Sequence, residues 1–166
     1  MQNIFLLLTL KKLLPEKIVA IELFGMHGLW HTKDYAGKVH RLDLFELDPH
    51  YHRLSKKVFK KLPVNYFNED SIKYISVTEN KYNLAVADIP AGGNFYTCDG
   101  MPVFWNDLVR ILLPGSVLIF NVHSDKLGSY KAIEDWIRNN SGDKKVRDIF
   151  FIARNSIVSY TTVAFQ

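Results

Sequence analysis

A chain of 166 residues with 48% hydrophobic content has room for one compact core, whereas two full domains would be cramped. The formal net charge of +4 is mild and its lysines are spread along the sequence, so composition does not favour a nucleic-acid partner. The single cysteine, Cys98, excludes an intramolecular disulfide and is typical of a reducing compartment, so we expect a cytoplasmic protein.

The first 16 residues contain an apolar run, residues 4–10, that ends at Lys11 and Lys12. This run has no basic start and no small-residue cleavage site, and it is far shorter than the roughly 20 residues that span a bilayer. We therefore expect residues 1–16 to form an amphipathic helix that docks on a domain formed by residues 17–166, with no membrane partner.

From Lys17 onward, short apolar runs alternate with helical patterns, as in successive βα units of a parallel sheet that is covered on both faces. The apolar runs predict five strands, over residues 17–24, 40–47, 64–68, 82–88 and 116–122. The segments between and after them predict four helices, over residues 49–62, 71–76, 102–113 and 129–139.

The end of the chain discriminates between sheet topologies. Residues 146–153 and 157–165 both have strand-like patterns, and only about three residues separate them. Because a parallel crossover needs about a dozen residues or more, these two strands must pair antiparallel. The sequence therefore predicts an α/β fold: a doubly wound, mostly parallel seven-stranded sheet with helices on both faces and a C-terminal antiparallel β-hairpin.

The turn after the first predicted strand contains two glycines, Gly25 and Gly28. In an open α/β sheet this turn lies where the strand order reverses, and there glycine lets the backbone approach a ligand while N–H groups point at its negative end. We predict a cofactor site at this turn, formed by Glu22, Gly25, Met26, His27 and Gly28.

Acidic residues lie at the ends of the next three predicted strands. Glu46 comes eighteen positions after Gly28, near the offset at which a carboxylate accepts hydrogen bonds from ribose hydroxyls. Asp70 could accept from an adenine amino group, and Asp88 would lie next to the reacting group. Glu46 and Asp48 could instead cap the helix predicted from Pro49; we expect Asp48 to cap and Glu46 to bind.

In chain order, four segments resemble the successive motifs of class I (Rossmann-like) S-adenosylmethionine-dependent methyltransferases: Glu22-x-x-Gly25-x-x-Gly28, Glu46-x-Asp48-Pro49, Asn68-x-Asp70 and Asp88-x-Pro90. The resemblance spans about residues 17–166, and a sheet that ends in a hairpin is a feature of this family. It implies S-adenosylmethionine as cofactor, with its ribose at Glu46, its adenine end at Asp70, its methionyl end at the glycine turn, and the substrate beside Asp88. Leu47 and Ser71 are further cofactor-binding candidates.

The sequence departs from the family pattern in two places. The first motif usually reads Glu/Asp-x-Gly-x-Gly-x-Gly, and here Phe24 and His27 occur in a stretch where glycines are common. The segment that begins at Asp88 also lacks the second proline and the aromatic residue of the Asp-Pro-Pro-Tyr turn, so N-methylation of adenine or glutamine is not favoured.

Asp88 and His123 are the catalytic candidates, because each could take a proton from a hydroxyl or amine as the methyl group arrives. Residues 92–100 are glycine-flanked and aromatic, and we predict a loop on the ligand side of the sheet there. The candidate substrate-binding residues are Trp30, His31, Phe95, Tyr96 and Asp99. We expect methyl transfer to a small-molecule or sugar-like acceptor, without a metal, and with a homodimer or partner subunit to complete the acceptor site.

Two other functions stay open on the sequence alone. An NAD(P)-dependent oxidoreductase shares the glycine turn and the acidic strand end, but it should have a third glycine and a catalytic tyrosine-lysine set. A non-catalytic S-adenosylmethionine-binding or scaffold protein would account for the departures in the first motif.

Overall fold

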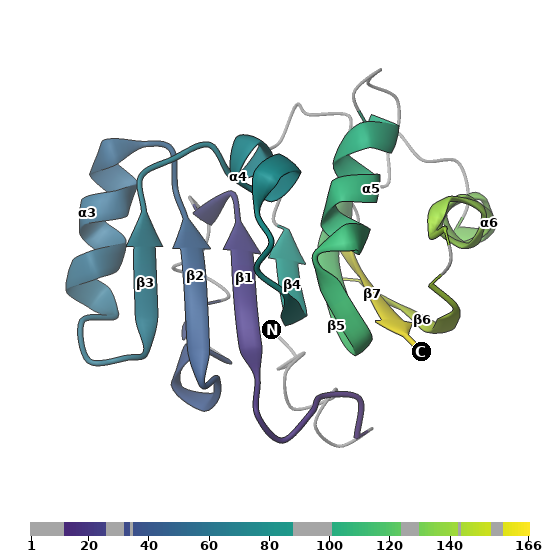
Figure 1. Cartoon of the computed structure of the whole chain (residues 1–166), viewed down its shortest axis with the longest axis horizontal. Helices are drawn as coiled ribbons and strands as arrows, with labels where there is room; N and C mark the ends of the chain where they lie inside the picture. The colour runs from purple at the N-terminus through teal and green to yellow at the C-terminus, as the bar shows by residue number, and fades with distance from the viewer. Residues whose placement is uncertain are drawn as a thin grey trace.

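The computed structural model describes residues 12–25, 32–33, 35–87, 101–123, 130–142, 144–153 and 158–166. Within these residues, seven strands form one sheet in the order β3-β2-β1-β4-β5-β7-β6 (Figure 1). The strands are β1 Val19–Leu23, β2 Arg41–Phe45, β3 Val64–Phe67, β4 Tyr82–Ala87, β5 Leu112–His123, β6 Val146–Ala153 and β7 Val158–Phe165.

The sheet is parallel from β3 to β5 and antiparallel at its other end. The chain runs outward from β1 through β2 to β3, and then returns to pair β4 with the free side of β1. The strand order thus reverses at β1, as in other doubly wound sheets. β7 pairs antiparallel with both β5 and β6. The predicted mostly parallel sheet and its closing hairpin are therefore confirmed.

Each of the four predicted helices is present, and two of them end earlier than predicted. The helices are α3 Pro49–Val58, α4 Ser71–Val77, α5 Met101–Arg110 and α6 Tyr130–Asn140, and a short 3-10 helix, η2, spans Ala36–Lys38. The N–H of Phe59 still bonds to the Ser55 carbonyl, but its backbone (φ −103°, ψ 17°) has left the helical conformation, so α3 ends at Val58. The extension of α5 to residue 113 was wrong, because Leu112 already pairs with Tyr82 as part of β5.

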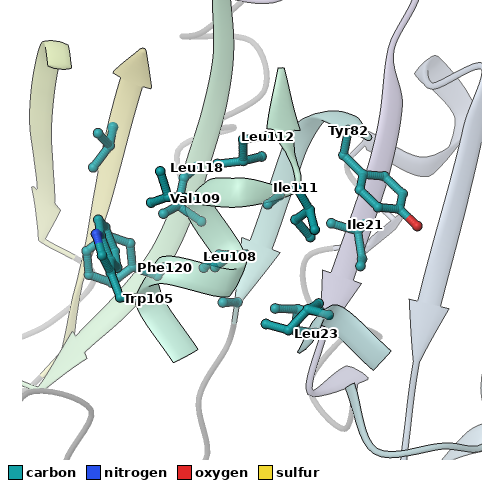
Figure 2. Close-up of a cluster of buried hydrophobic side chains, with 14 of the residues drawn as sticks. Ile21, Leu23, Tyr82, Trp105, Leu108, Val109, Ile111, Leu112, Leu118 and Phe120 are labelled. Atoms are coloured by element: carbon teal, nitrogen blue, oxygen red, sulfur yellow. The ribbon is translucent and has the colours of Figure 1, made fainter. Parts of the chain in front are cut away.

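Two apolar clusters cover the two faces of the sheet, since neighbouring strand residues such as Ala20 and Ile21 point to opposite sides. The larger cluster packs Trp105 and Leu108 of α5 against Ile21 and Phe120 of the sheet (Figure 2). The second cluster lies under Tyr35, Ala36 and the segment that precedes β1.

The predicted N-terminal helix is described only in its last part. Residues 12–16 form turn and bend, not helix, although Leu13 is buried in the second cluster. Residues 1–11 lie outside the described residues. None of the described helices is long and apolar enough to cross a bilayer.

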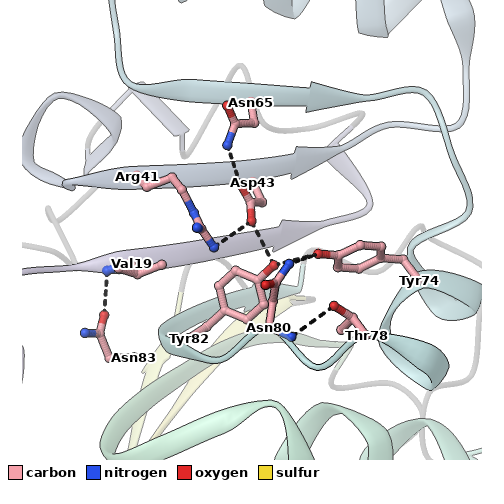
Figure 3. A network of polar contacts seen from close by, with 9 residues as sticks. All are labelled: Val19, Arg41, Asp43, Asn65, Tyr74, Thr78, Asn80, Tyr82 and Asn83. Atoms are coloured by element: carbon pink, nitrogen blue, oxygen red, sulfur yellow. Dashed lines mark hydrogen bonds and ion pairs between the residues drawn. The ribbon is translucent and has the colours of Figure 1, made fainter.

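A polar network inside the sheet joins β2, β3, β4 and α4 around the buried carboxylate of Asp43 (Figure 3). Asp43 accepts hydrogen bonds from the Tyr82 hydroxyl and the Asn65 amide, each at 2.8 Å, and pairs with Arg41 at 3.1 Å. The hydroxyls of Tyr74 and Tyr82 lie 3.1 Å apart. Burial, followed by the bonds to Tyr74 and Asp43, raises the pKa of Tyr82, so its phenol stays protonated. These bonds compensate for the burial of Asp43.

We expect Tyr82→Phe to lower the free energy of unfolding by about 1–3 kcal/mol, because Asp43 would lose a donor inside the sheet. Tyr66→Phe is the matched control, since the buried Tyr66 hydroxyl has no hydrogen-bond partner among the described residues. That control should change stability by less than about 0.5 kcal/mol. Urea denaturation of the two variants checks this, and equal losses would show that the Asp43 network does not stabilise the fold.

Candidate functional site

A cavity of about 560 Å³ opens at the carboxyl ends of β2 and β3, beside the turn that follows β1. In open α/β sheets, ligands bind outside the carboxyl ends of the strands, near the reversal of strand order. The cavity is lined by Phe24, Phe45, Glu46, Leu47, Asp48, Pro49, Glu69, Asp70, Ser71 and Ile72. Four of the predicted cofactor-binding residues thus line one cavity: Glu46, Leu47, Asp70 and Ser71.

Glu46 directly follows β2 and is only 5% exposed. Its Oε1 accepts a hydrogen bond from the backbone N–H of Asp48 at 2.7 Å, which fixes the turn before α3. Asp48 in turn caps α3 by accepting from the backbone N–H of His50 at 2.7 Å. The expectation that Asp48 caps the helix is confirmed, and the binding role of Glu46 stays a prediction.

Asn68 ties the turn after β2 to the turn after β3. Its side-chain amide donates to the carbonyl oxygens of Glu46 and Leu47 at 2.8 and 2.9 Å. Two residues later, Asp70 caps α4 by accepting from the backbone N–H of Ile72 at 2.9 Å. Sequence reasoning assigned no role to Asn68, although an amide side chain directly after a parallel strand was a usable signal.

The lining of the cavity combines negative charge with apolar surface. Glu46, Asp48, Glu69 and Asp70 supply four carboxylates, and no lysine or arginine is among the lining residues. Such a site suits a ligand that brings hydroxyl or amino donors, or a positive charge.

Apolar side chains line the same cavity as these carboxylates. Leu47, in the turn after β2, is 66% exposed, and Ile72, in the first turn of α4, is 46% exposed. Phe45 lines the cavity and stacks on Phe67, with ring centroids 4.6 Å apart. When a flat apolar ligand covers exposed aliphatic side chains beside a cavity, their surface is removed from water, and this stabilises the complex.

The turn after β1 has a glycine-like backbone despite its sequence. Phe24 has φ +62°, a left-handed conformation that glycine adopts most easily, and its ring lies 6.1 Å from that of Phe104 in α5. At Gly25, an added Cβ would lie 2.9 Å from the carbonyl oxygen of Phe45 and 3.1 Å from the Leu44 side chain. Gly25 is therefore required by the close packing of this turn against β2.

Glu22 is fully buried on the face of the sheet that carries the second apolar cluster, with Ala20 and Tyr35. It is not among the residues that line the described cavity. Its carboxylate accepts from the Thr32 hydroxyl at 2.7 and 2.8 Å, and also from the Tyr35 hydroxyl. Burial and the neighbouring carboxylate raise the pKa of Tyr35. Within the described residues, Glu22 thus anchors the segment that contains Thr32 and Tyr35.

Most of the other predicted site residues lie outside the described residues. These are Met26, His27, Gly28, Trp30, His31, Asp88, Phe95, Tyr96 and Asp99. The backbone of His123 ends β5, opposite Val158 of β7, and the position of its side chain is not described. The described residues contain no group of three or more histidine, cysteine or acidic side chains that could hold a metal ion.

No known family model matches this sequence, and no curated protein sequence matches it. Solved structures do match its fold. The N-methyltransferase NodS from Bradyrhizobium japonicum WM9 is 14% identical with a TM-score of 0.70, over 99% of this chain and 92% of that one. The chain has the class I methyltransferase fold. A putative methyltransferase from Streptococcus mutans, SMU.1697c, solved with S-adenosylhomocysteine, is 11% identical with a TM-score of 0.68, over 100% and 99% of the two chains.

The putative methyltransferase YhhF from Escherichia coli gives a similar match, with 10% identity and a TM-score of 0.69, over 99% of this chain and 85% of that one. Identities this low show a shared fold and nothing finer. The resemblance inferred from the sequence motifs is confirmed at the level of that fold. Within this fold, Glu46 and Asp70, which the motifs placed at the ends of two strands, line the same cavity.

We expect Gly25→Ala to destabilise the protein by about 1–3 kcal/mol, because the new methyl group would overlap the Phe45 carbonyl. Gly37→Ala is the matched control, since a Cβ there would lie 3.8 Å from the nearest atom, in Leu62. The control should stay within about 0.5 kcal/mol of the wild type. Thermal unfolding separates the two, and a Gly25→Ala protein as stable as the control would contradict the close packing of this turn.

Proposed function

We propose that this protein is an S-adenosylmethionine-dependent methyltransferase that acts on a small-molecule or sugar-like acceptor. The observation that carries the proposal is the position of Glu46 and Asp70 on one cavity at the strand ends of a class I methyltransferase fold. Two of the solved neighbours, SMU.1697c and a second structure of NodS, hold S-adenosylhomocysteine.

The residues around the cavity fit an adenosyl group. The Glu46 carboxylate can accept from ribose hydroxyls, and the Asp70 carboxylate from an adenine amino group. Leu47 and Ile72 can cover the two faces of a planar ring, which would remove their exposed aliphatic surface from water. Gly25 and the glycine turn after it would direct backbone N–H groups toward the methionyl carboxylate.

S-adenosylmethionine would supply a methyl group on a positively charged sulfur. The protein's own contribution would be to hold this ligand and align the acceptor, because alignment of nucleophile, methyl and sulfur accounts for much of such catalysis. Asp88 and His123 stay the candidates for taking a proton from the acceptor, and residues 92–100 with Trp30 and His31 stay the candidates for binding it.

One observation favours a second candidate, a protein that binds S-adenosylmethionine without transferring its methyl group. Phe24 holds a left-handed backbone at a place where the family commonly has glycine, and its side chain lines the cavity. A bulky ring in this position restricts how closely a ligand can approach the turn. A protein of this kind would bind S-adenosylmethionine in a titration and show no methyl transfer in an assay.

Calorimetric titration tests the proposed cofactor. We expect S-adenosylmethionine and S-adenosylhomocysteine to bind and NAD not to bind. Glu46→Gln should weaken both by about 10- to 100-fold, because hydrogen bonds to a charged group contribute about 1.5–3 kcal/mol. The substituted amide oxygen can still accept from the Asp48 N–H, so the turn should keep its conformation.

Glu79→Gln is the control for this titration, because Glu79 is exposed and is not among the residues that line the cavity. It should bind like the wild type. Binding of NAD alone would overturn the proposal, and so would an unchanged affinity in Glu46→Gln.

A further inference from the structure

The helix α3 and the turn that follows it carry five positive charges, more than the net charge of +4 of the whole chain. Arg53, Lys56 and Lys57 lie on α3, Lys60 and Lys61 follow it, and residues 49–68 contain no aspartate or glutamate. These five residues carry five positive charges against a net charge of +4, which leaves the rest of the chain at −1. The excess charge is therefore concentrated in one segment.

We call these five exposed cations the α3 stripe. Arg53, Lys56 and Lys57 are spaced three and four residues apart, so they share one side of the helix, and all five residues are exposed. The helix lies beside β3, the edge strand of the sheet (Figure 1). Phe59, which follows the last residue of the helix, is buried. The stripe therefore faces outward at one edge of the molecule.

Helix α6 is also charged, but its cations are paired with carboxylates of the same helix. Lys131 pairs with Asp135 and Arg138 pairs with Glu134, both across one helical turn. None of the five cations of the α3 stripe has an ion pair with a described carboxylate. Like charges three or four residues apart repel each other by a few tenths of a kcal/mol, so the pattern costs stability.

The helix dipole accounts for only part of this pattern. Lys56 and Lys57 lie in the last turn of α3, where positive charge is favourable. Arg53 lies in the middle of the helix, and Lys60 and Lys61 lie beyond its end. A stripe that no described carboxylate compensates is suited to an external polyanion.

We propose that the α3 stripe binds the phosphate backbone of a double-stranded nucleic acid. Lysine and arginine side chains in a row neutralise successive phosphates, and no described carboxylate pairs with these five cations. A membrane surface fits less well, because Val58 is the one strongly exposed aliphatic side chain of α3 among the described residues, too little apolar surface to insert into a bilayer.

This surface is separate from the cofactor cavity. The acidic cavity adjoins the start of α3 at Asp48 and Pro49, whereas the cations lie from the middle of the helix to beyond its end, and none of them lines the cavity. The proposal therefore does not depend on the proposed function. It revises the expectation, drawn from the mild overall charge, that nucleic acid is not a partner.

Fluorescence anisotropy with a labelled 20-base-pair RNA duplex and a DNA duplex of the same sequence tests the proposal. The α3 variant combines Arg53→Gln, Lys57→Gln and Lys60→Gln. The control variant combines Lys131→Gln, Arg138→Gln and Arg147→Gln, which removes the same net charge from cations that are paired with carboxylates.

We expect the wild type to bind at least one duplex with an affinity that falls steeply with salt. The α3 variant should bind about tenfold or more weakly and with a shallower salt dependence, while the control variant binds like the wild type. The proposal is overturned if the wild type binds neither duplex, if both variants weaken equally, or if only phosphatidylserine vesicles are bound. Titration of the same variants with S-adenosylmethionine keeps this result distinct from a failure of the cofactor site.

Discussion

The amide of Asn68 is the contact on which the geometry of the candidate site depends. It joins the carbonyl groups of Glu46 and Leu47 to the segment that follows β3, so two neighbouring strand ends cannot move apart independently. The Glu46 carboxylate then closes its own turn through the Asp48 N–H. With these bonds in place, Glu46 and Asp70 are held on one cavity by backbone that is already hydrogen-bonded.

The packing of the turn after β1 is a second constraint on the site, and it also acts at the end of β2. The turn after β1 lies directly on the Phe45 carbonyl, and only glycine at position 25 permits this approach. Phe24 keeps a left-handed backbone beside it, at a cost of about 1–3 kcal/mol that the surrounding packing must offset. Asp43, three residues before Glu46, bonds β2 to Asn65 of the neighbouring β3 and to Tyr82 of β4, two strands away. The site therefore depends on one well-fixed strand.

Much of this arrangement could be predicted from the sequence, because it follows from local patterns. Apolar runs gave the strands, the short spacing before Val158 gave the hairpin, and the acidic residues after β2 and β3 indicated the cavity. The errors came from contacts distant in sequence. The end of α5 was placed too late because the pairing of Leu112 with Tyr82 leaves no local signal.

Two site-level expectations show the same limit. The sequence predicts Glu22 as a cofactor residue from its place in the motif, which stays a prediction, and only the fold shows that the hydroxyls of Thr32 and Tyr35 donate to its carboxylate. The charge on α3 looked ordinary by composition, and only the fold shows that no described carboxylate pairs with its cations, in contrast to those of α6. For Glu22 and for the α3 cations, the side chains around a residue decide how its charge is used, and the residue type alone does not.

Hydrogen exchange followed by mass spectrometry, with and without S-adenosylhomocysteine, tests the central claim most directly. If the cavity at the ends of β2 and β3 is the cofactor site, added ligand should slow exchange at residues 46–48 and 70–72. Exchange in the hairpin formed by β6 and β7 should stay unchanged. Unaltered exchange at both turns in the presence of saturating ligand, or protection confined to the hairpin, would contradict the assignment of this site.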